Sequence, residues 1–501
     1  MSLANRLIQS SGLLVAIRFI QRSMGLVSTL VLARLLTPDD FGIIAVAALL
    51  IHFSEVLSNT GIQQYLIQAD RTDDAIVNTA WTLDVALKSS LALLLYAALP
   101  LVGLFYDDPR ITQAIAVLIP VIVVRALMNP ELHLQRRALK YGVIFRIGVI
   151  QKAVSFVVVI GVALYTRSFW AMVVGDLASS VVAVMLSYRY CTRRPALSFA
   201  NVGDQWQFSR WMLARGSIGY MRAQMDTLFV SKYFSLAQLG GFNMAREFTV
   251  MPANEVIQPA IEPLLSAFSQ DKSNRKELDR KVRLSVLVIT GFTAPIVGFL
   301  FFFYQPVVHY LLGSQWDSAA PLMQAMTPLL LAFSMTGILN NVCFSVGRVR
   351  TVFTFDTVSL LVIAVSLYLA HEMDLAAFVW LRSLVGLLTV LVFLRVCTGL
   401  VGGGYPVYLA LIGFPVSLAL ALAWAIHTAI ASTGFANLVI CGFVYTGAYL
   451  LAMAIAGIGL CRFSPTWQSA RHYVVVAGGA VVSRLQRNKH QGEGMGKGHS
   501  G

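Results

Sequence analysis

Apolar runs, each close to the length of a membrane-spanning helix, follow one another along the whole chain. A spanning helix takes about 20 mostly apolar residues, and short stretches of turn-forming residues separate the runs. The runs cover residues 11–36, 41–66, 79–104, 111–132, 143–165, 169–190, 207–234, 238–267, 284–303, 323–345, 351–370, 376–397, 407–430 and 436–460. The pattern therefore predicts an all-α polytopic membrane protein with about 14 transmembrane helices.

Composition supports this prediction and excludes other classes. The 501 residues are 57% hydrophobic and 12% charged, whereas a soluble domain has roughly 25% charged residues. A soluble enzyme, a nucleic-acid-binding module and a disordered scaffold are therefore excluded. The five cysteines form no CxxC pair, so neither a disulfide framework nor a zinc site is indicated. We expect no metal and no cofactor.

The basic residues predict the orientation of the helices. Lys and Arg concentrate on the cytoplasmic side of membrane proteins. With the N-terminus inside, 24 of the 38 Lys and Arg residues lie in cytoplasmic segments and four lie outside. The four outer residues are Arg34, Arg110, Arg167 and Lys232. Both termini are therefore expected in the cytoplasm, and residues 464–487 of the tail suit a helix lying on an anionic leaflet.

An internal repeat predicts the domain organisation. Residues 28–44 align without gaps to 226–242, and this match places Gly42 in register with Gly240. A second match pairs Pro120 and Lys140 with Pro328 and Arg348. Two matches with preserved orientation favour two six-helix lobes related by a parallel repeat. The predicted parts are residues 1–203, 204–398, 399–460 (two C-terminal helices) and 461–501 (the cytoplasmic tail).

Two arginines lie far from either end of the first predicted helix. Arg18 and Arg22 share one stripe of that helix with Ser11, Gly25 and Thr29, and they also distinguish this run from a cleaved signal peptide. A charge at the bilayer centre costs at least about 2.5–3.5 kcal/mol, and this helix has no acid to neutralise them. Because a guanidinium binds phosphate oxygens in pairs, we expect both arginines to line a water-filled cavity that attracts a diphosphate.

Other charged residues within the apolar runs extend this candidate site. The further candidates for substrate binding are Arg215, Arg222 and Arg246. The candidates for charge balance or for binding a coupling ion are Glu55, Asp226, Glu247, Glu255 and Glu262. A structural ion pair between Arg222 and Asp226 remains an equal alternative.

The positions of charged residues and prolines along the apolar runs predict further features. Lys88, Arg125 and Arg210 lie near predicted helix ends, where we expect their side chains to extend to the interface. Pro252, Pro259 and Pro263 interrupt the eighth run and suggest a kinked gate there.

Several short motifs resemble one family. The stretch LARLLTPDDFG at residues 32–42 is similar to the first loop of the bacterial Wzx-type polysaccharide flippases. Similar matches occur at residues 135–137 (QRR), 224–226 (QMD), 239–240 (LG) and 313–317 (GSQWD). The resemblance covers roughly residues 10–400. This family belongs to the exporter superfamily that also contains multidrug antiporters and the lipid II flippase.

The resemblance implies a transporter without enzymatic activity. It would flip an undecaprenyl-diphosphate-linked oligosaccharide across the bacterial inner membrane by alternating access, for exopolysaccharide or lipopolysaccharide biosynthesis. Membrane lipids surround it, a polysaccharide polymerase and the chain-length machinery are candidate partners, and nucleic acid is not. Coupling to H⁺ or Na⁺ is left open.

Two alternatives remain beside the flippase. A multidrug or cation antiporter of the same fold would need carboxylates in the first lobe, where the first helix offers arginines instead. A membrane polysaccharide polymerase or ligase would need a catalytic outer loop. The longest outer loop, residues 304–322, holds His309 and Asp317 without a convincing acid–base set, and its Tyr304, Tyr310 and Trp316 suggest an interfacial aromatic belt.

Overall fold

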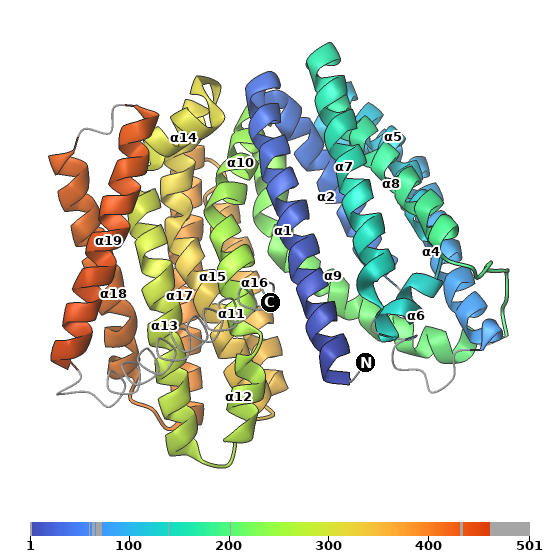
Figure 1. The fold of residues 1–501 in the computed structure, drawn as a ribbon. Coiled ribbons are helices and arrows are strands. Elements are labelled where there is room, and N and C mark those ends of the chain that lie inside the picture. Colours follow the sequence, from blue (N-terminus) through green and yellow to red (C-terminus); the bar gives the residue numbers. More distant parts are fainter. Residues whose placement is uncertain are drawn as a thin grey trace, which may run out of the picture. The chain divides into compact units, whose positions relative to one another are not determined.

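The computed structural model describes residues 3–59, 61–62, 66, 73–138, 140–200, 202–430 and 434–460. Throughout these residues the regular structure is helical, without a strand (Figure 1). The longer helices are α1 (Leu3–Leu35), α2 (Pro38–Leu57), α4 (Asp74–Tyr106), α5 (Pro109–Ala126), α7 (Tyr141–Thr166), α8 (Trp170–Tyr190), α9 (Val202–Tyr233), α10 (Leu236–Pro252), α13 (Arg275–Phe302), α15 (Ala320–Ser345), α16 (Val349–Leu369), α17 (Leu375–Val401), α18 (Tyr405–Ala429) and α19 (Phe435–Leu460). The shorter ones are α6 (Glu131–Arg137), α11 (Gln258–Ile261), α12 (Leu264–Gln270) and α14 (Tyr304–Leu312). The predicted tail helix at 464–487 lies outside the described residues.

The helices confirm the all-α, multi-pass prediction. Each of the predicted spans overlaps a helix, although α2 ends at Leu57 within the run 41–66 and α5 ends at Ala126 within the run 111–132. The eighth run, 238–267, is divided among α10, α11 and α12. Within the described residues, 11 helices are long and apolar enough to cross a membrane. The three remaining predicted spans lie on α1, on α9 and on the divided stretch. The chain is therefore a multi-pass membrane protein.

The chain forms two compact units. Unit 1 comprises residues 1–245, 311–319 and 367–378, and unit 2 comprises the rest. In unit 1, α7 packs against α1 and α8, while α5 contacts α2, α4 and α8. In unit 2, α13 packs against α15 and α18. These units do not test the predicted lobe boundaries, which stay a prediction.

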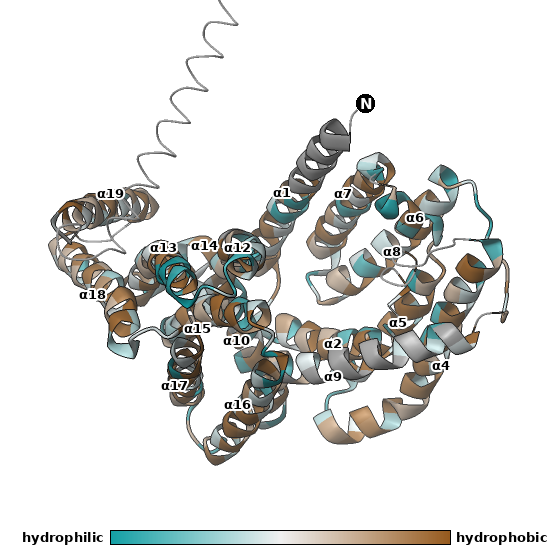
Figure 2. Cartoon of the chain, turned by 90° about the horizontal axis from the view of Figure 1, so that it is seen from below, coloured by the Kyte–Doolittle hydropathy of each residue, from teal (hydrophilic) through white to brown (hydrophobic). Residues whose placement is uncertain are grey.

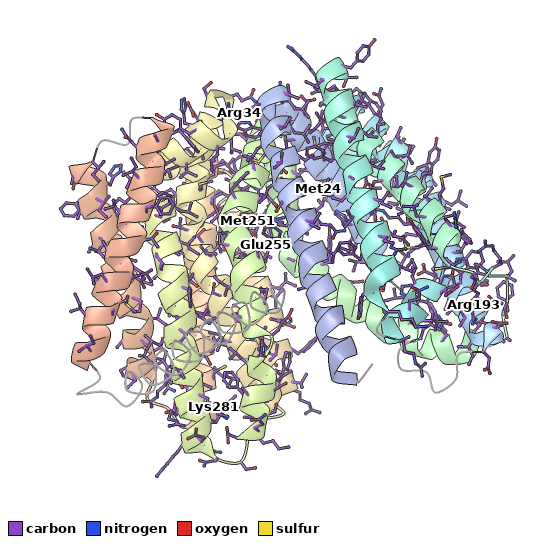
Figure 3. All side chains as sticks on the ribbon, viewed as in Figure 1. Met24, Arg34, Arg193, Met251, Glu255 and Lys281 are labelled. Carbon is purple, nitrogen blue, oxygen red and sulfur yellow. The ribbon has the colours of Figure 1, made fainter. Side chains whose placement is uncertain are left out.

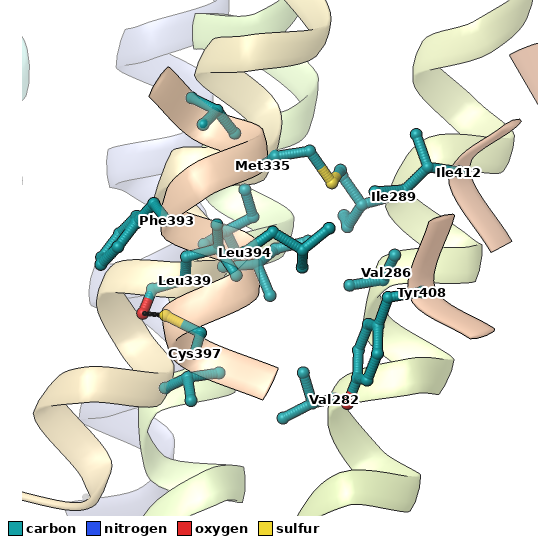
Figure 4. Packing of buried hydrophobic residues seen from close by; sticks show 14 of the residues in the cluster. Val282, Val286, Ile289, Met335, Leu339, Phe393, Leu394, Cys397, Tyr408 and Ile412 are labelled. Carbon is teal, nitrogen blue, oxygen red and sulfur yellow. Dashed lines mark hydrogen bonds between the residues drawn. The ribbon is translucent and has the colours of Figure 1, made fainter. Parts of the chain in front are cut away.

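The main apolar core of unit 2 lies around α13. Ile289, Met335, Leu394 and their neighbours from α13, α15, α17 and α18 interdigitate there (Figure 4). In the same cluster the thiols of Cys343 and Cys397 are 3.5 Å apart. Because lipid tails are as apolar as these side chains, such contacts stabilise the fold by close packing.

The outward faces of the helices suit a lipid environment. Leu104, Leu369 and Phe443 each leave about three quarters of their side chains exposed, and apolar colour dominates the helices seen from below (Figure 2). Polar colour is prominent at the lower end of α13 and on α6 (Figure 2). Large exposed apolar surfaces mark contact with a membrane or a partner, and their wide distribution here indicates lipid.

The two segments that the sequence repeat matches share one local structure, a capped helix start. Thr37 caps α2 through a reciprocal pair of hydrogen bonds with Asp40, and Ser235 caps α10 through the same arrangement with Gln238. Such capping boxes satisfy backbone N–H groups at a helix start. The offset between the two caps is the one that the sequence match predicts.

The two repeated corners meet at a pair of glycines. A Cβ on Gly42 would overlap the carbonyl oxygen of Leu236, and a Cβ on Gly240 would overlap the carbonyl oxygen of Pro38. The start of each helix therefore lies directly against the backbone of the other. Glycine is required at both positions because no side chain fits there.

The segment 304–322, which the sequence analysis expects to be an outer loop, departs from the prediction at Trp316. This side chain does not form part of an interfacial belt but is fully buried. Its Nε1 donates a hydrogen bond of 2.7 Å to the carbonyl oxygen of Ala33, and its ring packs edge-on against Phe41 at 5.1 Å. The Nε2 of Gln315 donates to the carbonyl of Leu36 at 3.1 Å. The last carbonyls of a helix lack intrahelical donors, and this loop supplies them to α1.

The prolines of the eighth run break the helix as predicted. α10 ends at Pro252, a π-helical turn covers Ala253–Ile257, and a further turn divides α11 from α12. The Nδ2 of Asn341 donates a hydrogen bond of 3.0 Å to the carbonyl oxygen of Ile261, which satisfies backbone freed by the break. A gating role for this kink stays a prediction.

Candidate functional site

A guanidinium bridges two carboxylates inside unit 1. Nη1 of Arg125 lies 2.5 Å from Oε1 of Glu55, and Nη2 lies 2.5 Å from Oδ1 of Asp176. Nε of Arg125 donates a third hydrogen bond, of 3.1 Å, to Oγ of Ser180. Nδ1 of His52 is 3.1 Å from the other oxygen of Glu55. We call these five residues, from α2, α5 and α8, the Arg125 network.

The Arg125 network lies near the ends of the helices that form it and remains accessible. Glu55 and Arg125 stand in the last turns of α2 and α5, and Asp176 stands in the second turn of α8. The side chains of Arg125, Glu55 and Asp176 keep 30%, 27% and 37% of their surface exposed. Charge-assisted hydrogen bonds of this kind are strong. One cation therefore holds two acids that would otherwise be left uncompensated.

The structure gives Arg125 and Lys88 ion-pair partners that the sequence analysis did not include. Arg125 stands in the last turn of α5, near a helix end as predicted, and joins the network. Nζ of Lys88 pairs with Asp84 at 2.7 Å, one turn away on α4. The missing signal was Asp176, a second acid in an apolar run that requires a cation. The side chain of Arg210 lies outside the described residues.

The arginines of α1 lie beside its contact with α7. Nε2 of Gln21 donates a hydrogen bond of 3.1 Å to the carbonyl oxygen of Gly148, and the absence of a side chain at Gly148 allows this approach. Arg22, next to Gln21, is half-buried, while Arg18, one turn earlier, is exposed. The side chain of Ser11 lies outside the described residues.

The same interface contains a lysine that the sequence analysis did not select. Nζ of Lys152, in the middle of α7, is 3.5 Å from the point where a Cβ on Gly25 would stand. Its charge interacts with those of Arg22 and Asp176. The α1–α7 interface and the Arg125 network therefore form one electrostatic system within unit 1.

The other candidates are distributed more widely. On α9, Asp226 is buried. The side chains of Arg215 and Arg222 are not among those described, so the predicted ion pair between Arg222 and Asp226 is not tested. In unit 2, Arg246 is half-buried and Glu247, Glu255 and Glu262 are exposed; Figure 3 labels Glu255 together with Met251, one turn earlier. Within unit 1, the structure joins Glu55 to Arg125. The roles predicted for all of these residues stay predictions.

The motif at residues 135–137 lies on α6, in a polar cluster at one end of unit 1. Oε2 of Glu131 accepts a hydrogen bond of 2.8 Å from the N–H of Arg193, and Nδ2 of Asn129 donates one of 2.8 Å to the carbonyl of Arg193. The guanidinium of Arg193 pairs with Asp74 at 2.6 Å (Figure 3). Burial, with the nearby charges of Arg136 and Lys88, lowers the pKa of His133 to about 4. These contacts fasten the end of α8 to α6.

Among the described residues, no cluster of three or more His, Cys, Asp or Glu side chains is placed to hold a metal ion. The chemistry that the described side chains of unit 1 offer is therefore ionic, with cations and carboxylates held within helices.

Comparisons with known proteins agree in sequence and in fold. A family model described as "Polysaccharide biosynthesis protein" matches residues 31–321. Lipopolysaccharide biosynthesis protein WzxC of Escherichia coli K12 is 26% identical, over 79% of this chain and 82% of the relative. Succinoglycan biosynthesis transport protein ExoT of Rhizobium meliloti is 24% identical, over 58% of this chain and 60% of the relative.

Two solved structures have a similar fold. The lipid II flippase MurJ, in an inward closed conformation, matches with a TM-score of 0.72 and 13% identity, over 90% of this chain and 99% of its own. An inward-facing multidrug transporter of the MATE family matches with a TM-score of 0.56 and 11% identity, over 76% of this chain and 94% of its own. At such identities the likeness establishes the fold alone.

Proposed function

The chain belongs to the polysaccharide biosynthesis protein family, and from this membership we propose that it flips lipid-linked oligosaccharide repeat units across the bacterial inner membrane. It is a transporter and not an enzyme. The observation that carries the proposal is the agreement along 79% of the chain with a lipopolysaccharide biosynthesis protein. The fold shared with a lipid II flippase is consistent with it.

The proposed substrate is an oligosaccharide on an undecaprenyl diphosphate. The diphosphate is the part of this molecule whose transfer through the bilayer costs the most free energy, because it carries charge. Arg18 and Arg22 supply guanidinium groups in α1, and guanidinium binds phosphate oxygens in pairs. The Arg125 network is consistent with this role, since Glu55 and Asp176 are both paired with Arg125.

The remaining parts of the proposal concern the cell. Both termini lie in the cytoplasm, alternating access moves the substrate outward, and a polymerase with its chain-length machinery receives it. H⁺ or Na⁺ coupling would use a carboxylate such as Glu55 or Asp226. A multidrug antiporter of the same fold is the second candidate, but none of the contacts described for unit 1 favours a cationic drug over a diphosphate.

A clean deletion of the gene tests the proposal. We expect surface polysaccharide to disappear while lipid-linked repeat units accumulate on the cytoplasmic face. Extraction of the lipid-linked repeat units measures their total amount, and lectin labelling of inverted and right-side-out vesicles measures the face on which they lie. Expression from a plasmid should restore export. Normal export in the deletion strain, with no second flippase present, would show that the function is different.

A further inference from the structure

Among the described residues, one lysine in the middle of a membrane span forms no ion pair with an acid. Lys152 is the twelfth residue of α7, roughly 16 Å from the start of the helix at 1.5 Å per residue, and its side chain is half-buried. Among the described residues, no carboxylate forms an ion pair with its ammonium group and no acceptor forms a hydrogen bond with it. A charge in this position is costly unless it meets a counter-charge.

Lys88 shows how the same fold treats a lysine with a structural role. It also lies within a long apolar helix, but Asp84 stands one turn away and accepts from its Nζ at 2.7 Å. The carboxylate that could serve Lys152 in this way is Asp176. That carboxylate is bound instead by Nη2 of Arg125 at 2.5 Å.

The surroundings of Lys152 add positive charge and leave space. Arg22 lies on the facing side of α1, close enough for its charge to act on Lys152. Gly25, one turn further along α1, has no side chain and leaves room at the ammonium group. An ammonium carries three N–H donors. The α1–α7 interface therefore places the N–H donors of Lys152 beside Arg22, at a glycine where only Lys152 lies within 4 Å of an added Cβ.

We propose that Lys152 binds the diphosphate of the lipid-linked substrate, together with Arg22, at the α1–α7 interface. This inference rests on the proposed function and adds a residue from a second helix to the candidate site. The Arg125 network has a defined part in it: Arg125 holds Asp176 in an ion pair, so this carboxylate acts on Lys152 only from a distance and leaves its N–H donors to the ligand. The ligand contacts backbone at Gly25 because that position carries no side chain.

Binding of inorganic pyrophosphate to the purified full chain tests the proposal directly. Titration calorimetry in phosphatidylcholine nanodiscs would compare the wild type with Lys152→Met and Lys152→Arg. We expect Lys152→Met to weaken pyrophosphate binding at least tenfold and Lys152→Arg to stay within about threefold. Lys140→Met is the matched control, because Lys140 is an exposed lysine that precedes the same helix, and it should bind like the wild type.

Two further arms identify the source of the phosphate. Orthophosphate at equal ionic strength should bind more weakly than pyrophosphate if two linked phosphates are recognised. Nanodiscs containing phosphatidylglycerol should leave pyrophosphate binding unchanged; strong competition would assign the site to an ordinary lipid headgroup and overturn the proposal. Melting temperature and membrane abundance, recorded for each variant, separate loss of binding from loss of folding.

The outcome can be separated from that of the gene deletion. Unchanged pyrophosphate affinity in folded Lys152→Met would refute the role of Lys152 while leaving the flippase function intact. Should Lys152→Met fail to fold, Lys152→Gln and Gly25→Leu provide the test, since the second variant obstructs the same position without changing charge. Wild-type affinity in folded Gly25→Leu would likewise place the ligand elsewhere.

Discussion

At the scale of single residues, Arg125 makes two carboxylates tolerable within helices. Removing one partner of such a group leaves an uncompensated charge, which costs about 3–5 kcal/mol when buried. We expect Arg125→Gln to lower membrane abundance and the melting temperature in detergent, with the partial exposure of the network reducing the full cost. Adding Glu55→Gln and Asp176→Asn should restore both. Wild-type membrane abundance and melting temperature in Arg125→Gln alone would contradict this account.

The arginines of α1 should respond differently. If Arg18 and Arg22 attract the diphosphate, Ala variants should enter the membrane at normal abundance while export falls roughly tenfold or more, because a hydrogen bond to a charged group contributes about 1.5–3 kcal/mol. Lys should restore export only in part, since it lacks the paired donors. Polysaccharide export per molecule is the measurement. A loss of abundance without a change in export per molecule would indicate a structural role.

His133 predicts a loss of stability in acid. Its pKa is about 4 in the folded chain and about 6.5 when unfolded, so the unfolded chain binds more protons between these values. Its contribution is complete above pH 6.5 and is lost as the pH falls towards 4, by up to roughly 3 kcal/mol. Melting curves from pH 7.5 to 5 should therefore decline less for His133→Gln than for the wild type. His309→Gln, at an exposed histidine, should change nothing.

At the scale of elements, the closest backbone approach described above is the crossing of α2 and α10 at Gly42 and Gly240. Overfilling a packed interface typically costs about 1–3 kcal/mol, and the added methyl group here meets rigid backbone. We expect Gly42→Ala and Gly240→Ala to lower the melting temperature clearly, as followed by size-exclusion after heating. Gly161→Ala on α7 is the control, since open space surrounds that position. Equal stability of all three variants would contradict the crossing.

The sequence predicts elements well because their causes are local. Hydropathy locates the helices, Pro252 and Pro263 mark the broken stretch, and the repeat locates both capped corners. It does not predict the partners of Arg125 or the burial of Trp316. Those depend on residues dozens to hundreds of positions apart, which packing alone brings together, so an arginine near a helix end and a tryptophan in a loop resemble interfacial residues.

At the scale of the whole molecule, the basic residues predict the topology. We expect reporter fusions at Gly434, in the α18–α19 connection, to report an outer location. Fusions after Gly403, in the α17–α18 connection, should report a cytoplasmic one. Phosphatase and fluorescent-protein activities measure the two sides independently. The reverse pattern would invert the orientation of the whole chain and place both termini outside.

The reciprocal glycine contact also bears on how the two halves of this chain could diverge. After a duplication, most positions of each copy can drift independently, because their neighbours lie within the same copy. Gly42 and Gly240 cannot, since each one faces backbone supplied by the other copy, and an altered backbone in either would act on both. The corner thus constrains both segments at once, and we expect the sequence similarity between the two segments to persist longest there.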